Sequence, residues 1–194
     1  MSQYLPNNKE YEFLSLAYTR FEEIWQIYTN PNFYDQIAEY RFSCIKEAFS
    51  IYSEVITYQP IRDYLEGLEQ NKDKLWLIMN IEFPKVVRNI ILHFPFSKWD
   101  DIYINKSIAT WNTVNKHSTI DKFFEKYKGV VPIEVETLSK SDISNKFKIN
   151  FPVQYDEVGK TYLKDMINEE SGVDLFMTLM RSAMASQMES LINN

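Results

Sequence analysis

The amino-acid sequence predicts an all-α protein, a single helical bundle over residues 1–194 with a small β-hairpin or extended arm inserted at 130–156, before the C-terminal helices. Three observations indicate this fold. Apolar residues recur at steps of three and four along most of the chain, which is the spacing of one helix face. Four glycines and seven prolines are too few for a turn-rich β-sandwich or β-barrel. An aromatic content of 15% argues against disorder and supplies a substantial core.

Two helices joined by a short loop are predicted at the N-terminus. The first spans 9–29 and the second 33–58, and each carries an apolar face with helical spacing. Asn7 and Glu10, three residues apart, have the spacing of a capping box at the start of the first helix. Because the loop between the helices is short, we expect them to form an antiparallel hairpin.

The middle of the chain contains its most apolar segment. A short helix is predicted at 61–70, and the stretch 75–94 is apolar on most sides, as expected of a helix buried in the middle of a bundle. Pro84 should kink this helix or start a new segment, because its ring removes a backbone donor and clashes with the preceding turn. Pro95 limits how far the helix can continue.

Serine followed three residues later by aspartate, a spacing that resembles a capping box, occurs at 97–100 and at 118–121. The first pair is expected to open a helix through Trp99 and Trp111. The second opens a helix that Gly129 closes. We expect both tryptophans in the core, with stacking on nucleic-acid bases as the alternative.

Residues 130–156 change character. Two weakly alternating runs, 130–135 and 146–151, flank a polar segment, which predicts a β-hairpin or an extended arm. From about residue 157 the helical pattern returns. The apolar stripe of this last region includes Met177, Met180 and Met184. Methionines at helical spacing usually fill a core, and a promiscuous binding surface is the alternative.

The composition excludes several classes of protein. The single cysteine, Cys44, cannot build a disulfide framework or a thiolate zinc site, and we expect it in the core. We expect no signal peptide, because the first ten residues have no basic region and no continuous apolar region, and the sequence has no apolar run of about 18–20 residues. We therefore expect a cytoplasmic protein that does not enter a membrane. It lacks a glycine-rich phosphate loop, a Gly-x-Ser-x-Gly elbow and a His-Glu-x-x-His motif, and we expect no cofactor and no metal.

The charge is unevenly distributed. An excess of acids, 27 against 21 lysines and arginines, argues against binding nucleic acid over the whole surface. Between Pro84 and His117, however, five basic residues stand against two aspartates, a local balance of +3. The basic residues are Lys85, Arg88, Lys98, Lys106 and Lys116. A solvated helix surface would also explain such a segment.

The polar residues that interrupt the apolar stretch 75–94 include Arg88, Asn89 and His93. Asn89 and His93 are four residues apart and therefore share a helix face. A histidine that can take or give a proton near neutral pH, close to the planar donor fork of an arginine, suits a phosphodiester substrate. The alternative is structural, because buried polar groups need partners. In that interpretation Arg88 pairs with an acid on a neighbouring helix and His93 is a core histidine.

The pattern Arg-Asn-x-x-x-His, late in a helix of a small all-α bundle, resembles the signature of HEPN-domain proteins, whose motif Arg88, Asn89 and His93 match. The resemblance implies a HEPN-like fold and a homodimer in which two motifs face each other across a cleft. It also implies a toxin of a toxin–antitoxin pair or a phage-defence effector, with a protein antitoxin or inhibitor as partner. One HEPN subgroup has a tyrosine two places after the histidine, where this chain has Pro95.

The sequence therefore predicts a metal-independent endoribonuclease that cleaves RNA through attack by the ribose 2′-hydroxyl. His93 would act as general acid or base, Arg88 would stabilise charge on the phosphoryl oxygens, and Asn89 would be an orienting or phosphate-binding group. The residues expected to guide the RNA backbone are Lys85, Lys98 and Lys106. Two alternatives stay open: a catalytically silent HEPN-like binding module, and a helical interaction protein without a nucleic-acid function.

Overall fold

Helices dominate the fold, and two small antiparallel sheets accompany them. The computed structural model describes residues 7–58, 78–110, 119–138 and 144–192. These residues form two compact units: unit 1 contains the residues up to 88 and from 176 onward, and unit 2 contains 89–175. That both units belong to one domain stays a prediction. The predicted helix at 61–70 and residues Trp111, Lys116 and His117 lie outside the described residues. Among those described, no helix combines the length and apolar character needed to cross a membrane.

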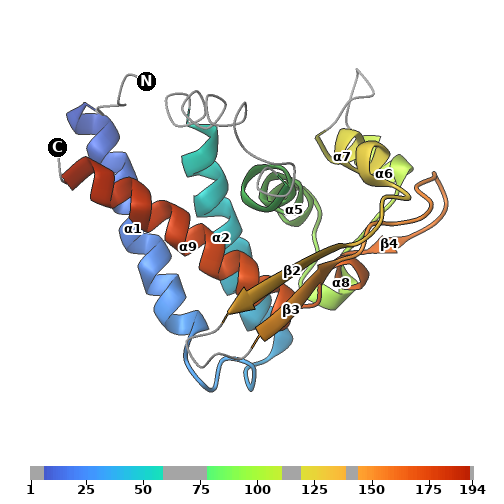
Figure 1. Ribbon diagram of the computed structural model, residues 1–194, viewed down its shortest axis with the longest axis horizontal. Coiled ribbons are helices and arrows are strands. Elements are labelled where there is room, and N and C mark those ends of the chain that lie inside the picture. Colours follow the sequence, from blue (N-terminus) through green and yellow to red (C-terminus); the bar gives the residue numbers. More distant parts are fainter. Residues whose placement is uncertain (1–6, 59–77, 111–118, 139–143, 193–194) are drawn as a thin grey trace. The chain divides into compact units, whose positions relative to one another are not determined.

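Helices α1 (Asn8–Tyr28) and α2 (Ala38–Thr57) form the predicted antiparallel hairpin in unit 1 (Figure 1). The predicted capping box starts α1. The Oδ1 atom of Asn7 accepts the backbone N–H of Glu10 at 3.1 Å, and the Glu10 carboxylate accepts the N–H of Asn7 at 2.7 Å. Two of the backbone N–H groups that a helix start exposes are thereby satisfied.

The second helix starts later than its apolar pattern predicts. It was expected from residue 33, but consecutive turns precede it: the N–H of Phe33 bonds the carbonyl of Asn30 at 2.9 Å, and the N–H of Gln36 bonds the carbonyl of Phe33 at 3.1 Å. Ile37 then caps α2 with 71% of its surface exposed. This isoleucine therefore does not belong to the core face of the helix.

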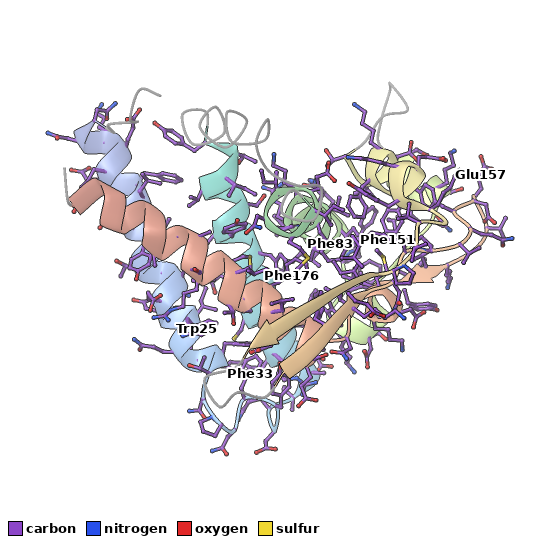
Figure 2. All side chains as sticks on the ribbon, viewed as in Figure 1. Trp25, Phe33, Phe83, Phe151, Glu157 and Phe176 are labelled. Carbon is purple, nitrogen blue, oxygen red and sulfur yellow. The ribbon has the colours of Figure 1, made fainter. Side chains whose placement is uncertain are left out.

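The last helix, α9 (Ser171–Ile192), completes the core of unit 1, to which it belongs from Phe176 onward. The rings of Phe83 and Phe176 stack with their centroids 5.0 Å apart and point toward each other (Figure 2). Phe49 of α2 lies 6.2 Å from the Phe176 ring. The buried residues of the unit include Cys44, Met177, Met180 and Met184. The cysteine and the methionines are therefore core residues, as predicted.

Pro84 starts a new helical segment, as predicted. A π-helical turn, η1 (Ile78–Glu82), precedes helix α5 (Phe83–His93). Because proline has no N–H, it cannot bond the carbonyl four residues back, which is that of Asn80. The hydroxyl of Tyr52 on α2 donates to this carbonyl at 2.8 Å. Burial raises the pKa of Tyr52 above its ordinary value and so keeps the hydroxyl protonated as a donor.

The helix predicted over 97–111 is wrong. Its place is taken by a 3₁₀ turn, η2 (Trp99–Asp101), a short strand, β1 (Tyr103–Ile104), and helix α6 (Lys106–Thr110). The expected capping box is not formed, because Lys98 occupies the position before η2 and its side chain makes no capping bond. Trp99 itself is buried, as predicted, and is not available for base stacking.

Strand β1 follows an alternation that the capping signal obscured. Ile102 and Ile104 are buried, and Tyr103 between them is half-buried. This period of two is the pattern of a strand with one covered face. β1 pairs antiparallel with β4 (Thr161–Tyr162), so that Tyr103 lies opposite Tyr162.

The middle of unit 2 matches its prediction. Helix α7 (Thr119–Tyr127) ends near Gly129, whose φ of 69° lies in the left-handed region that favours glycine. The predicted hairpin follows: β2 (Ile133–Leu138) pairs antiparallel with β3 (Ser144–Ile149), as Figure 1 shows. The register places the first residue of β2 opposite the last residue of β3.

Regular helix returns later than the predicted residue 157. The short helix α8 (Leu163–Met166) comes after β4, and α9 begins only at Ser171. The irregular chain before β4 is held by a buried hydrogen bond, in which the Tyr155 hydroxyl donates to Oδ1 of Asp121 on α7 at 3.2 Å. Burial, together with this carboxylate, raises the pKa of Tyr155. A side-chain hydrogen bond, and not a helical backbone, therefore holds this segment in place.

Candidate functional site

Helix α5 carries all three residues of the Arg-Asn-x-x-x-His pattern. Successive residues of an α-helix are rotated by about 100°, so Asn89 and His93 are separated by about 40° around the axis. Arg88 belongs to unit 1, and Asn89 and His93 belong to unit 2.

An ion pair holds Arg88 in unit 1. Its Nη2 atom donates to Oε1 of Glu54 on α2 at 2.8 Å, and the two side chains are 25% and 57% exposed. For Arg88, the structural interpretation is therefore confirmed, because the arginine does pair with an acid on a neighbouring helix. Exposed pairs of this kind contribute about 0–1 kcal/mol. The main consequence of this bond is the direction of the guanidinium group, which is turned toward α2.

His93 and Asn89 lie at the carboxyl-terminal end of α5. The His93 side chain is exposed, and that of Asn89 is half-buried. The interpretation of His93 as a core histidine is therefore wrong. An exposed imidazole can exchange protons with a ligand that arrives from solvent, and the amide one turn earlier offers both a donor and an acceptor.

The three lysines expected to guide RNA are not equivalent. Lys85 on α5 and Lys98 before η2 are half-buried. Lys106 at the start of α6 donates to Oε1 of Glu125 on α7 at 2.6 Å, and Lys128 donates to the other carboxylate oxygen. This hydrogen bond raises the pKa of Lys106, and the two lysines lower the pKa of Glu125. Lys106 is thus engaged with a carboxylate inside unit 2, and the local charge is smaller than the sequence count indicates.

The Lys106–Glu125–Lys128 cluster predicts a specific loss of stability in acid. A carboxyl with a lowered pKa stabilises the fold above its ordinary value, 4.5, and this contribution is lost as the pH falls through the lowered pKa. In urea unfolding from neutral pH down to acid, Glu125→Gln should therefore lose stability less steeply than the unmodified chain below pH 4.5. Glu134→Gln is the matched control, because the Glu134 contact with Lys148 is 3.7 Å long. Parallel curves for the chain and Glu125→Gln would contradict the prediction.

The sequence did not indicate the acidic partners of the candidate residues. Glu54 is 34 residues from Arg88, and Glu125 is 19 residues from Lys106, so no local spacing links either pair. A basic residue in an apolar helix signals that some acid must lie nearby, but it does not say which one. Only the packing of α5 on α2 and of α6 near α7 identifies these carboxylates.

The described residues contain no group of three or more histidine, cysteine, aspartate or glutamate side chains placed to hold a metal ion. The candidate residues of unit 2 are the exposed His93 and the half-buried Asn89 one turn earlier, and Arg88 is the paired residue of unit 1. Comparison of the chain with protein-family models, with curated proteins and with solved structures finds no match.

Proposed function

We propose that the chain is a metal-independent endoribonuclease of the HEPN type that acts as a toxin or phage-defence effector. The observation that carries the proposal is the exposure of His93 at the end of α5, on the same side of the helix as Asn89. An imidazole within a largely apolar sequence segment would normally be covered by the core. Its exposure is the arrangement that acid–base catalysis on a soluble substrate requires.

The proposed reaction needs one nucleophile, one proton acceptor and one proton donor. The ribose 2′-hydroxyl attacks the phosphorus, and the bond from phosphorus to the 5′-oxygen breaks. The products are a 2′,3′-cyclic phosphate and a 5′-hydroxyl. His93 takes the proton from the 2′-hydroxyl or gives one to the leaving oxygen. Arg88 and Asn89 donate to the phosphoryl oxygens, where negative charge grows in the transition state.

A site shared by two copies of the chain fits this division of roles. In unit 1, the guanidinium of Arg88 bonds Glu54. Two copies related by a two-fold axis supply two imidazoles, one as base and one as acid. We therefore propose a homodimer, with RNA bound between the two α5 helices.

The reaction class is tested with purified protein, a panel of structured and unstructured RNAs, and excess EDTA. We expect cleavage to persist in EDTA and the products to end in a 2′,3′-cyclic phosphate and a 5′-hydroxyl. Those ends are characteristic of 2′-hydroxyl attack, whereas attack by water leaves a linear phosphate. Absence of cleavage across the panel, or cleavage that EDTA abolishes, would contradict the proposal.

A second candidate function is a catalytically silent HEPN-like binding module, and the Arg88–Glu54 ion pair favours it. A guanidinium bonded to a carboxylate is already partly neutralised, so less of its charge is offered to a phosphate. The two functions separate in the same experiment. A silent module binds a ligand, and no RNA cleavage products form.

A further inference from the structure

Four aromatic rings form a continuous series in unit 2, beginning at the residue after His93. They are Phe94, Phe96, Tyr103 and Tyr162, here called the aromatic ladder. Neighbouring ring centroids in it are 6.3, 5.6 and 5.9 Å apart. All four residues are half-buried, so part of each lies at the surface.

The backbone explains why the first rings turn away from α5. Pro95 stops the helix, and the N–H of Phe96 bonds the carbonyl of Phe94 at 2.9 Å, which makes a tight turn. The ring of Phe96 then meets the edge of Tyr103 with an interplanar angle of 70°. The end of the candidate catalytic helix is thus connected to the β1–β4 sheet through aromatic contacts.

The small sheet fixes the other half of the aromatic ladder. Tyr103 of β1 and Tyr162 of β4 are directly opposite in the register. Ile102, Ile104 and Leu163 are buried on the alternate positions. Because successive side chains of a strand point to opposite faces, the two tyrosines share the outer face. Their position is set by the buried neighbours and does not depend on a ligand.

Two exposed lysines accompany the tyrosines. The Nζ atom of Lys160 lies 4.2 Å from the centroid of the Tyr103 ring, and that of Lys164 lies 5.6 Å from the Tyr162 ring. Both lysines are exposed. An ammonium group over a ring is held next to the π-face without being neutralised by a carboxylate. It can therefore bond a phosphate beside the ring, and a base of the same strand would stack on the ring face opposite the ammonium.

The net charge around the aromatic ladder is zero. The segments 93–104 and 160–165 contain three lysines and three aspartates. Binding of a polyanion to this surface therefore cannot rely on a strong positive field. The placement of lysines over rings favours a ligand that presents flat bases together with phosphates. A double helix hides its bases in the stack, whereas a single strand exposes them.

We propose that the aromatic ladder, with Lys160 and Lys164, binds single-stranded RNA and leads it to His93. The choice of RNA as the natural strand rests on the proposed function, and the binding surface does not. The rings stack on successive bases and the two ammonium groups bond the phosphates between them. Because every base has a π-face, the surface has little preference for sequence.

The rings are tested with a fluorescein-labelled, 2′-O-methylated oligouridine of about twelve nucleotides, which resists 2′-hydroxyl attack and matches common site sizes. Binding to the full chain is followed by fluorescence anisotropy. Tyr103→Leu and Tyr162→Leu should each weaken binding by about 5- to 150-fold, the range reported for loss of one base–aromatic stack. Tyr103→Phe retains the ring and should bind within about twofold of the unmodified chain. Tyr40→Leu, which removes an exposed tyrosine of unit 1, should have no effect.

The lysines are tested in the same assay through its salt dependence. Removing two phosphate contacts from a single strand should lower the slope of log Kd against log salt by about 1.4. Lys160→Gln combined with Lys164→Gln should show this change. Lys126→Gln is the matched control, because Lys126 lies 5.0 Å from the ring of the buried Tyr127 and outside the aromatic ladder.

Three results would overturn the proposal: no binding of the probe by the unmodified chain, equal binding of a duplex of the same length, or unchanged binding by the tyrosine and lysine variants. The variants are compared only after thermal unfolding shows that they fold, and the double lysine variant keeps the test valid if a tyrosine variant does not. Binding of the probe, together with no cleavage of the RNA panel, supports this surface and contradicts the proposed nuclease. Cleavage of the RNA panel, together with unchanged probe binding by the variants, supports the nuclease and contradicts this surface.

Discussion

Replacement of His93 by alanine is expected to lower the rate of RNA cleavage by about 10²- to 10⁴-fold, which is the usual contribution of a general acid or base. The fold should be unaffected, because His93 is exposed at the end of α5 and surface substitutions usually change stability by less than about 0.5 kcal/mol. The measurement is the initial rate of cleavage in EDTA, compared between the two proteins at equal concentration. Thermal unfolding of each protein shows whether the fold is retained.

The chain offers a matched control for this test. It has two histidines, so His117→Ala removes an imidazole without touching the Arg-Asn-x-x-x-His pattern. We expect His117→Ala to cleave at the rate of the unmodified chain. Equal rates for the unmodified chain and His93→Ala would show that the activity belongs to another residue or to a contaminant. Equal losses in both histidine variants would point to a structural cause.

His93 is a better first test than Arg88. Substitution of Arg88 by alanine also removes the partner of the Glu54 carboxylate on α2, and it truncates a stem that is three-quarters covered. A loss of activity in that variant would mix catalysis with packing. The exposed imidazole has neither complication, so its removal reports on chemistry more directly.

The parts of the fold that the sequence predicts are those with local causes. The capping box at Asn7 and the missing N–H of Pro84 act within one turn, and both elements begin where these residues require. Gly129 ends α7 for the same reason, because a positive φ is a property of one residue. The β2–β3 hairpin also joins neighbouring segments, so the alternation of apolar and polar residues in its strands can be recognised in the sequence.

The region around η2 and β1 could not be predicted in the same way. Its strand exists only because Thr161 and Tyr162 pair with it, almost sixty residues later. The alternation of Ile102, Tyr103 and Ile104 is too short to outweigh the capping-box spacing in the sequence. The capping-box spacing was the strongest local signal present, and tertiary pairing overrode it.

The same distinction between local patterns and distant contacts applies to the candidate site. The Arg-Asn-x-x-x-His pattern is local, and the sequence identifies it together with its helix. The Glu54 partner, the carboxylate on Lys106 and the tyrosine pair opposite each other in the sheet all depend on contacts between distant segments. Sequence spacing names residues that share a helix, and only the folded chain shows which of them are already bonded to an acid.

The second large effect concerns stability. Trp99→Ala is expected to lower the free energy of unfolding of unit 2 by about 3–5 kcal/mol, the range for removal of a large aromatic side chain from a core. Trp99 is 1% exposed, and its indole N–H donates to the carbonyl of Ile167 at 3.2 Å. The variant therefore loses packing across η2 and leaves a buried carbonyl to find another donor. Urea unfolding followed by circular dichroism measures the loss, since fluorescence changes with the tryptophan itself.

Trp99→Phe narrows the difference, because it keeps an aromatic ring in the core and removes the N–H donor together with a smaller part of the side chain. Its expected cost is about 1–3 kcal/mol, that of one unsatisfied buried acceptor. Amide hydrogen exchange locates the effect: faster exchange should concentrate in 89–175, the residues of unit 2. Uniformly faster exchange through α1 and α2 as well would mean that the two units unfold together. Equal stability of Trp99→Ala and the unmodified chain would contradict the assigned core role.

The packing of Trp99 also bears on the proposed path of the RNA. Because η2 connects the turn after His93 to β1, loss of the Trp99 side chain should also weaken binding at the aromatic ladder.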